Sequence, residues 1–439
     1  MESARGIAYK ILLNSARHSS YSNIALDREL SLSDLSDADK SLCSIITLGV
    51  TERALTLDSM IDRLAARPGD IDIEARILLR MGIYQIEYLD RIPDHAAVNE
   101  TVALAPRRIR GFVNAILRSF LRARAAEGID SLFPSREDDP IGFLSLKYSF
   151  PRDMCHRFSE IYGFLRTEKI FEIFNRAPKM TLRINSLKIG RGEYAKLLDE
   201  REIRYELSDR LEDAILIDSV GFAALPGADE GYFFIQDEAS QICVEALGAT
   251  EGDLLIDTCS CPGSKSFGSA IRMKNRGEIH SFDLHKSKLS LIENGAERLG
   301  IDIIRVAERD GRKPDESLFG RADKVLCDVP CSGLGVIAKK PEIRYKSLDG
   351  FKRLPEIQLD ILSASAAYVK VGGVLLYSTC TVLPEENEKN VERFLNEHEN
   401  FEAVDFVADG KKSENGMLSL SPDTDRTDGF FVAKMKRKG

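Results

Sequence analysis

Five short apolar runs constrain the fold of this chain more than any other feature of its sequence. The runs cover residues 254–256, 278–282, 303–306, 324–327 and 374–377. Each run ends at a small or acidic residue and leads into a loop, and helical segments lie between the runs. Strands that alternate with helices are typical of a doubly wound parallel sheet, whose ligands bind beyond the carboxyl ends of its strands. We therefore predict an α/β domain over residues 233–439, completed by an antiparallel pair at 401–406 and 429–435.

The first 135 residues carry a different pattern, in which apolar residues recur three or four positions apart. Ile7, Ile11 and Leu12 follow this spacing, and later groups repeat it. Such spacing places apolar side chains on one face of a helix. Because no strand-like alternation interrupts it, we predict an all-α domain over residues 1–135.

A cluster of arginines marks the last helix predicted in that domain. The cluster contains Arg107, Arg108, Arg110, Arg118, Arg122 and Arg124. The helical period predicts one apolar face made of Phe112, Ala115, Ile116 and Phe120. Arg118 and Arg122 would stand one turn apart on another face. The net charge of −9 argues against coating nucleic acid through bulk positive charge, so this face is either a local contact surface or an ordinary solvated one.

Between these two regions the chain changes character again. Pro134 and Pro140 bracket a polar, charged stretch that is typical of a linker. Beyond it, helical segments mix with short extended runs at 179–184 and 214–218. We predict a small α+β domain over residues 140–232.

The loop after the first apolar run, DTCSCPGSKSFG, begins at Asp257 and predicts a cofactor site. A dinucleotide fingerprint needs more glycines than Gly263 and Gly268 supply, and a P-loop is excluded because Ser264 separates Gly263 from Lys265. The remaining interpretation is a strand-to-helix turn whose backbone N–H groups and Lys265 receive a carboxylate, as an S-adenosylmethionine site requires.

Acidic residues follow the next two runs. Asp283 ends the second run, where a carboxylate can accept hydrogen bonds from a ribose diol. Asp310 follows the third run and would accept from the exocyclic amine of an adenine. Each acid alone is as well explained as an ordinary loop residue, but their order after consecutive strands favours a nucleoside site.

Two cysteines follow the fourth and fifth runs, within CDVPCSGLG and YSTCT. Cys331 and Cys380 have polar, loop-forming neighbours, so the role of a small buried hydrophobic residue suits them poorly. That role suits Cys43, Cys155 and Cys243 well. A zinc site is a minor alternative, because the cysteine spacings lack a second C-x2-C and no histidine pair lies nearby.

The order of these motifs resembles the RNA 5-methylcytosine methyltransferases. The matching motifs are DTCSCPGSK, FDLH, RDG, CDVPCSG and YSTCT, and Arg183-Ile184-Asn185 is similar to the RxN element that precedes them. GVTERALTLD, LLRMGIYQIEYLDRIPDHAAVNETV and GFVNAILR resemble a NusB-like RNA-binding domain. With FIQDEASQ and DGFFVAKM, the chain is similar over almost its whole length to the RsmB/Fmu/Sun family of 16S rRNA (cytosine-C5)-methyltransferases.

The resemblance implies a Rossmann-like methyltransferase domain and a role for each motif. Cys380 would attack the base, Cys331 would assist release of the product, and Asp328 would contact the base beside the cofactor. The residues implied for S-adenosylmethionine are Cys259, Ser260, Cys261, Pro262, Gly263, Ser264, Lys265, Asp283, Asp310 and Asp328. The family's first motif usually reads Cys-Ala-Ala-Pro-Gly-Gly-Lys, so this chain departs from it at Ser260, Cys261 and Ser264.

The implied substrate is 16S rRNA before the small subunit is fully assembled. The N-terminal domain would hold RNA phosphates, and the middle domain would act as an RNA-binding or linking module. We expect no membrane segment, because no stretch of about 18 apolar residues occurs. We also expect a cytoplasmic protein that is a monomer and holds no metal. Two alternatives stay open: the same chemistry on tRNA or on another ribosomal cytosine, and a catalytically inactive RNA-binding assembly or antitermination factor.

Overall fold

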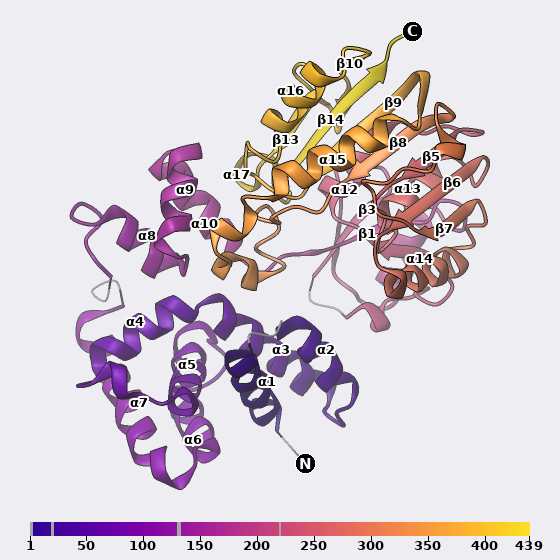
Figure 1. The fold of residues 1–439 in the computed structure, drawn as a ribbon. Helices are drawn as coiled ribbons and strands as arrows, with labels where there is room; N and C mark the ends of the chain where they lie inside the picture. The colour runs from indigo at the N-terminus through magenta and orange to yellow at the C-terminus, as the bar shows by residue number, and fades with distance from the viewer. Residues whose placement is uncertain (1–2, 19–21, 130–132, 219–220) are drawn as a thin grey trace. The chain divides into compact units, whose positions relative to one another are not determined.

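The computed structural model describes residues 3–18, 22–129, 133–218 and 221–439, and the chain forms two compact units (Figure 1). One unit, which we call the helical unit, joins Met1–Arg176 to Ile337–Leu348. The other, which we call the sheet unit, joins Ala177–Val336 to Asp349–Gly439. No helix within the described ranges combines the length and the apolar character needed to cross a bilayer.

The helical unit begins with the all-α arrangement predicted from the sequence. Its first helices are α1 (Ala4–His18), α2 (Ser22–Ser31), α3 (Asp37–Glu52), α4 (Ala54–Leu64), α5 (Ile73–Tyr88), α6 (Asp94–Leu104) and α7 (Arg107–Glu127), with a short 3-10 turn at Pro68–Asp70. Helix α5 lies at the centre, since Leu78, Leu79 and Ile83 are fully buried. Two of these helices are capped at their N-termini by a side chain. Ser36 accepts a hydrogen bond from the N–H of Asp39 in α3, and Asp72 accepts one from the N–H of Ala75 in α5.

Helix α7 buries two of the four residues predicted for its apolar face, Ile116 and Phe120, but not the other two. The buried stripe is Val113, Ile116, Leu117 and Phe120, whereas Phe112 is 39% exposed and Ala115 is also exposed. These four positions follow the i, i+3, i+4, i+7 spacing of one helix face, and Phe112 and Ala115 each precede a member of that stripe by one residue. Arg118 and Arg122 are exposed, as predicted.

Three further helices belong to the helical unit: α8 (Pro140–Tyr148), α9 (Arg152–Tyr162) and α10 (Phe164–Phe174). They enclose an aromatic cluster in which the rings of Phe150 and Phe171 stack with their centroids 3.8 Å apart. The predicted middle domain, 140–232, is therefore divided between the two units at Arg176. This part is bonded to the first helices of the helical unit: the Thr56 hydroxyl donates to the Leu146 carbonyl at 2.7 Å, and Arg53 donates to the Asn175 carbonyl at 3.2 Å.

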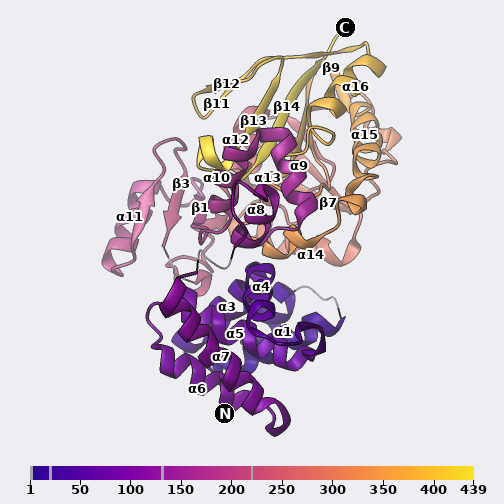
Figure 2. The same ribbon diagram turned by 90° about the vertical axis from the view of Figure 1, so that its left-hand side faces the viewer.

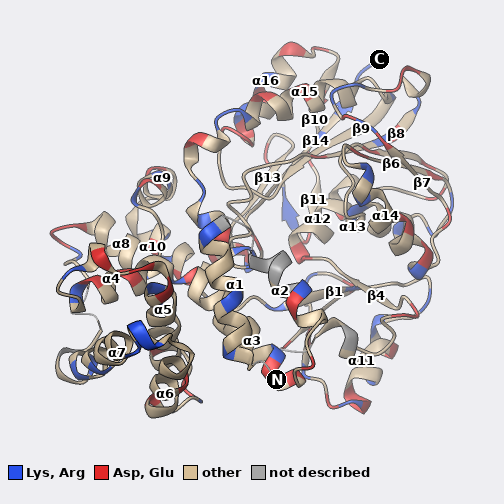
Figure 3. Cartoon of the chain, turned by 60° about the horizontal axis from the view of Figure 1, so that its bottom comes forward, with Lys and Arg blue, Asp and Glu red and all other residues tan. Residues whose placement is uncertain are grey.

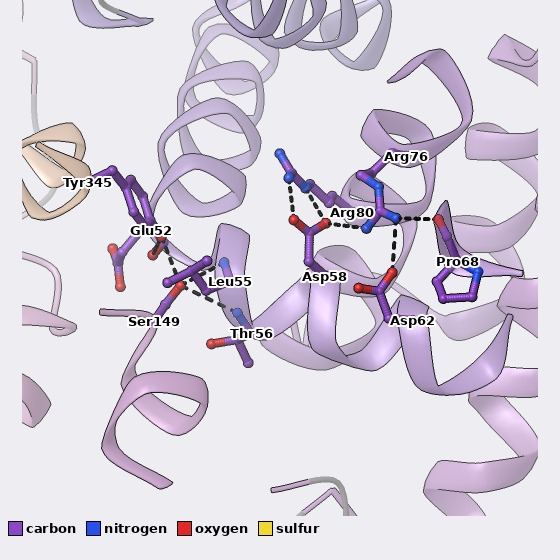
Figure 4. Close-up of polar contacts among 10 residues, drawn as sticks. All are labelled: Glu52, Leu55, Thr56, Asp58, Asp62, Pro68, Arg76, Arg80, Ser149 and Tyr345. Atoms are coloured by element: carbon purple, nitrogen blue, oxygen red, sulfur yellow. Dashed lines mark hydrogen bonds and ion pairs between the residues drawn. The ribbon is translucent and has the colours of Figure 1, made fainter. Parts of the chain in front are cut away.

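Residues 337–348 return to the helical unit through a 3-10 turn, Pro341–Tyr345. Arg344 is fully buried, and its Nη1 donates to the carbonyls of Glu52 (3.2 Å) and Tyr148 (3.3 Å) and to Oδ1 of Asn175 (2.7 Å). The Tyr345 hydroxyl donates to the Glu52 carbonyl at 2.8 Å and lies 2.8 Å from the Ser149 hydroxyl (Figure 4).

Ser149 also completes the start of α4. Its Oγ accepts from the backbone N–H groups of Leu55 (3.0 Å) and Thr56 (3.5 Å), which no residue of α4 itself can satisfy (Figure 4). On the same helix, Asp58 pairs with both Arg76 and Arg80.

The sheet unit contains a small antiparallel sheet in the order β2-β3-β1-β4. Its strands are β1 (Met180–Ile184), β2 (Tyr205–Leu207), β3 (Ala214–Ile217) and β4 (Phe233–Ile235), with α11 (Arg191–Glu200) beside them and a 3-10 turn at Phe222–Ala224. Strands β1 and β3 correspond to the two extended runs predicted in this region. The other two strands were not predicted, and each is only three residues long.

The large sheet follows the order β10-β14-β9-β8-β5-β6-β7, with β13 paired to β14. Its strands are β5 (Leu254–Asp257), β6 (Glu278–Asp283), β7 (Ile304–Glu308), β8 (Ala322–Asp328), β9 (Val369–Thr379), β10 (Phe401–Ala403), β13 (Met417–Leu420) and β14 (Phe430–Arg437). The five predicted strands are parallel, which confirms the α/β prediction. The predicted antiparallel pair of β10 and β14 is also confirmed, and β14 joins the sheet beside β9 (Figure 2).

Helices cover both faces of this sheet. They are α12 (Glu238–Leu247), α13 (Ser264–Arg272), α14 (Lys286–Leu299), α15 (Leu354–Ala366) and α16 (Glu388–Glu397); short elements lie at Glu316–Leu318, Leu348–Phe351, Val407–Ala408, Lys411–Lys412 and Pro422–Asp425. Leu255 and Leu376 belong to the core with α12, α13 and α14, whereas their neighbours Ile256 and Leu375 belong to the core with α15 and α16. Burial on both faces explains the near-continuous apolar runs of these strands.

We predict that Ser149→Ala lowers the free energy of unfolding by about 1 kcal/mol, because two N–H groups at the start of α4 lose their acceptor. Chemical denaturation monitored by circular dichroism measures this. The control is Ser44→Ala, whose hydroxyl donates to the Lys40 carbonyl inside α3 and whose loss should matter much less. Equal losses in the two variants would contradict the role given to Ser149.

Candidate active site

The candidate site lies along one edge of the large sheet, where the parallel strands end. The strand order β9-β8-β5-β6-β7 sets Cys380, Asp328, the 258–263 turn, Asp283 and Asp310 in sequence along this edge. The structure therefore brings the predicted site residues to the carboxyl ends of neighbouring strands, where ligands bind in sheets of this kind.

Two thiols meet at the ends of β8 and β9. The Sγ atoms of Cys331 and Cys380 are 3.2 Å apart, and the backbone N–H of Cys380 donates to Sγ of Cys331 at 3.3 Å. The hydrogen bond with Cys380, together with burial, raises the pKa of the Cys331 thiol well above its usual range. Because a negative charge on one sulfur opposes a second on the other, the pair holds one thiolate far more readily than two.

The two cysteine loops are bound directly to each other. The hydroxyls of Ser332 and Thr381 lie 2.6 Å apart, and the N–H of Gly335 donates to the Cys380 carbonyl at 3.0 Å. Gly335 also lies against Gly429, so closely that a Cβ at Gly335 would fall 1.8 Å from the Gly429 carbonyl oxygen. Only a glycine at 335 permits this approach.

A buried carboxylate, Glu386, joins the same network and was not predicted from the sequence. It is 1% exposed, and its Oε2 accepts from the N–H of Ser332 (3.0 Å) and from Nε2 of Gln358 (2.7 Å). The Tyr377 hydroxyl donates to the Glu386 carbonyl at 2.6 Å. The only sequence signal was an acidic stretch after YSTCT, which resembles any solvated helix start.

Asp328, the last residue of β8, forms an ion pair with Lys265. The Lys265 Nζ lies 2.6 Å from Oδ2 of Asp328, and the Ser378 hydroxyl donates to Oδ1 at 2.7 Å. Burial is the largest single influence on the pKa of Lys265 and acts to lower it, but the charge and hydrogen bond of Asp328, together with the nearby Cys243 and Cys380, raise that pKa overall. Lys265 was predicted to receive a cofactor carboxylate, and the structure pairs it with Asp328.

The 258–263 turn runs from β5 into α13. The backbone N–H and the hydroxyl of Ser260 both donate to the Phe282 carbonyl, at 2.8 and 3.0 Å, and the Cys261–Pro262 peptide is cis. Gly263 has φ +108°, and a Cβ there would fall 2.5 Å from the Phe267 ring. Ser264 is already the first residue of α13, so the glycine that the family usually has at this position is not needed for a positive φ.

The turn contains two cysteines, Cys259 and Cys261, whose thiols both have raised pKa values. Burial raises the pKa of the Cys259 thiol well above its usual range and also raises that of Cys261. The Cys261 N–H donates to Oδ2 of Asp283 at 3.3 Å, which ties the turn to the end of β6. Elsewhere Cys43, Cys155 and Cys243 are buried, as predicted.

Asp283 and Asp310 are fixed by short-range hydrogen bonds. Asp283 Oδ1 accepts from the N–H of His285 at 2.9 Å. Asp310 accepts from Arg312 through the backbone N–H (3.1 Å), Nε (3.0 Å) and Nη2 (2.8 Å), and these bonds lower the pKa of its carboxyl group. Both carboxylates keep further lone pairs for a ligand.

Beneath the turn lies a second carboxylate that sequence reasoning did not place in the site. Asp257 is 1% exposed and accepts a hydrogen bond from the Ser266 hydroxyl at 2.6 Å. The Ser266 hydroxyl also lies 2.8 Å from the Ser281 hydroxyl. Burial raises the pKa of Asp257 to about 7, although the bond from Ser266 acts against that shift. This contact joins the end of β5 to the first turn of α13.

These groups fit the donors and acceptors of S-adenosylmethionine. The first turn of α13 presents backbone N–H groups that suit a carboxylate, Asp283 suits a diol, and Asp310 suits an amine. Among the residues that the structure describes, no cluster of three or more His, Cys, Asp or Glu side chains is arranged to hold a metal ion.

Comparison with known proteins supports a specific assignment. The family model "NusB family" matches residues 2–122, "Methyltr_RsmF/B-like, ferredoxin-like domain" matches 150–221, and "16S rRNA methyltransferase RsmB/F" matches 244–436. "Probable ribosomal RNA small subunit methyltransferase B" of Bacillus subtilis is 37% identical over 450 aligned positions, covering 100% of this chain and 99% of that one. "Ribosomal RNA small subunit methyltransferase B" of Klebsiella pneumoniae is 31% identical, covering 92% and 91%.

Solved structures share the fold. The crystal structure of PH0851 superposes with a TM-score of 0.80 at 25% identity, covering 99% of each chain. NSun6 from Pyrococcus horikoshii with SFG superposes with a TM-score of 0.59 at 22% identity, covering 66% of this chain and 99% of that one, and so shares the fold of that part. From the full-length relatives and the three matching models, this chain belongs to the RsmB/F family of 16S rRNA methyltransferases.

Proposed function

We propose that this S-adenosylmethionine-dependent methyltransferase modifies C5 of a cytosine in 16S rRNA through a covalent bond between Cys380 and C6 of the base. The observation that carries the proposal is the 3.2 Å approach of the Cys331 and Cys380 sulfurs, beside Asp328. Two thiols at the ends of adjacent strands suit a reaction that needs one sulfur to attack and a second to assist departure.

The chemistry explains why a thiolate is needed. C5 of cytosine is a poor nucleophile, but addition of the Cys380 thiolate to C6 moves an electron pair into the ring and makes C5 nucleophilic. Bound S-adenosylmethionine supplies an electrophilic methyl group for C5. Loss of the C5 proton then restores the C5–C6 double bond as the bond between C6 and Sγ of Cys380 breaks. Cys331, in contact with Cys380, would assist that last step.

Asp328 is the proposed contact for the base. Its carboxylate is held by Lys265 and Ser378, so its orientation is fixed before the substrate arrives. Addition of the thiolate sends negative charge toward N3 of the ring, so Asp328 would stabilise the adduct by sharing a proton with N3, while Lys265 offsets the charge that remains on the carboxyl group. The residues 259–265, with Asp283, Asp310 and Asp328, would hold the cofactor.

The substrate must present a cytosine that can leave its stack. Unstacking costs least in a loop of folded RNA, which favours rRNA before the small subunit is fully assembled. Such a substrate would be met in the cytoplasm. Helix α7 carries many basic residues, drawn in blue in Figure 3. Arg107, Arg118 and Arg122 are exposed along it, so this helix offers a contact surface for RNA phosphates. Arg108 and Arg124 are instead paired with acidic residues of the helical unit.

We predict that Asp283→Ala and Asp310→Ala each weaken binding of S-adenosylmethionine by about tenfold or more, because each removes a charged acceptor. Isothermal titration calorimetry on the full chain measures this. Asp302→Ala is the matched control, since Asp302 is an exposed acid just before β7, at the opposite end of that strand. Unchanged affinity in both site variants would refute the assigned cofactor contacts.

We predict that Cys380→Ala abolishes methylation while leaving cofactor binding intact, because the ring is never activated. Cys331→Ala should still form the covalent adduct but release it slowly, so a protein–RNA complex should survive denaturing electrophoresis. Unmodified 16S rRNA and S-adenosylmethionine are the reactants, and bisulfite sequencing locates the product.

The double variant is the control and should trap no complex. A stable complex with Cys380→Ala and none with Cys331→Ala would exchange the two roles. Methylation of tRNA in place of 16S rRNA would keep the chemistry and replace the substrate, and a wild-type chain that binds RNA without methylating it would point to an inactive assembly factor.

We predict that Arg118→Ala with Arg122→Ala weakens RNA binding and reduces the salt dependence of the affinity by about one charge for each phosphate that these arginines no longer bind. Fluorescence anisotropy over a series of salt concentrations gives that slope. Arg108→Ala is the control, because its charge is already compensated by Asp72 and Glu74. If the slope is unchanged in the double variant, this face of α7 is only solvated.

A further inference from the structure

The two active-site thiols lie between charges of opposite sign. Glu386 accepts a hydrogen bond from the N–H of Ser332, the residue directly after Cys331. Lys265, held by Asp328, interacts electrostatically with Cys380. The shorter bond of Glu386 to the two cysteine loops is therefore the one to the loop of Cys331, since the Thr381 hydroxyl after Cys380 lies 3.5 Å from its carboxylate, whereas the cation acts on Cys380.

Glu386 is buried and is hydrogen-bonded by uncharged donors. It is 1% exposed, and the three hydrogen bonds to its carboxylate come from uncharged donors: the N–H of Ser332 (3.0 Å), the amide of Gln358 (2.7 Å) and, at the longer distance of 3.5 Å, the hydroxyl of Thr381. In the part of the chain that the structure describes, no lysine or arginine forms an ion pair with it. A buried carboxylate whose field is not cancelled acts strongly on a thiol close by.

The groups that act on Cys331 come from several elements. Cys380 faces it from the end of β9, Glu386 from the segment before α16, and the Tyr377 hydroxyl from within β9. Asp328 ends β8 and is neutralised by Lys265 of α13. The nearby charge that is not neutralised is therefore that of Glu386, and it opposes ionisation of Cys331.

We infer that Glu386 determines which of the two thiols ionises: its buried charge keeps Cys331 in the thiol form, so that Cys380 carries the thiolate. Glu386 is thus a positioning residue, which acts through Cys331 and does not touch the base. This inference rests on the proposed function for its role in the reaction, but the protonation of Cys331 is a property of the chain without RNA.

The electrostatic part of the inference is tested by the reactivity of Cys331 in the full chain. In a Cys380→Ala background, the rate of Cys331 alkylation by iodoacetamide is followed against pH by mass spectrometry. Adding Glu386→Gln should lower the apparent pKa of Cys331 by about one unit or more, because the opposing charge is gone. The glutamine oxygen can keep both bonds that Glu386 Oε2 accepts, so the loop geometry is retained.

Two further variants separate charge from structure. Glu385→Gln makes the same change on the adjacent residue, whose side chain is 40% exposed and paired with Lys389, and should leave the titration of Cys331 unmoved. Glu386→Ala is a second neutral variant and should shift the titration in the same direction as Glu386→Gln, so the result does not depend on one variant folding. Melting temperatures report the fold of each.

The outcomes are distinct. An unmoved titration of Cys331 in the neutral Glu386 variants, or an equal shift in Glu385→Gln, overturns the inference. A shift confined to the Glu386 variants supports it, whatever the fate of the RNA reaction, because neither RNA nor cofactor is in the assay. If that shift occurs and the wild-type chain yields no 5-methylcytosine, the proposed function fails and the electrostatic role of Glu386 stands.

Discussion

The register between β8 and β9 is the constraint on which the candidate site depends. These strands pair in parallel with Asp328 opposite Ser378, so their following loops leave the sheet side by side. The sulfurs of Cys331 and Cys380 meet for that reason, and the Ser378 hydroxyl reaches Asp328 across the same pair of strands. A slip of one residue would turn Ser378 and Asp328 to opposite faces and separate these groups.

Around this register the site is built largely from buried charge. Taking Lys265 and Asp328 out of water is costly, and their attraction offsets that cost only because the pair is close and further bonded by Ser378. Hydrophobic side chains would stabilise the same volume at least as well. The charges are therefore better explained by the fixed electrostatic field they create beside the thiols than by a contribution to stability.

The parts of the molecule set by local patterns could be predicted from the sequence. The parallel strands, the acids and cysteines at their ends, and the exposed Arg118 and Arg122 all follow from short-range periodicity. What could not be predicted depends on distant contacts. Glu386 joins the site because the fold brings it to Ser332. Residues 140–176 join the helical unit through hydrogen bonds to Arg53 and Thr56, which lie some 90 or more positions earlier in the chain. The predicted face of α7 was shifted because Phe112 and Ala115 sit one position away from the buried stripe.

The return of residues 337–348 to the helical unit has a consequence for how such a chain can be inherited. The helical unit is made from two stretches of sequence that lie far apart, so no single break in the gene would yield two complete halves. A gene that lost its first third would still encode Arg344, but the Glu52 carbonyl that accepts from its guanidinium would be gone. A cation shaped for burial would then be without part of its burial site, which would lower the stability of what remains of the helical unit.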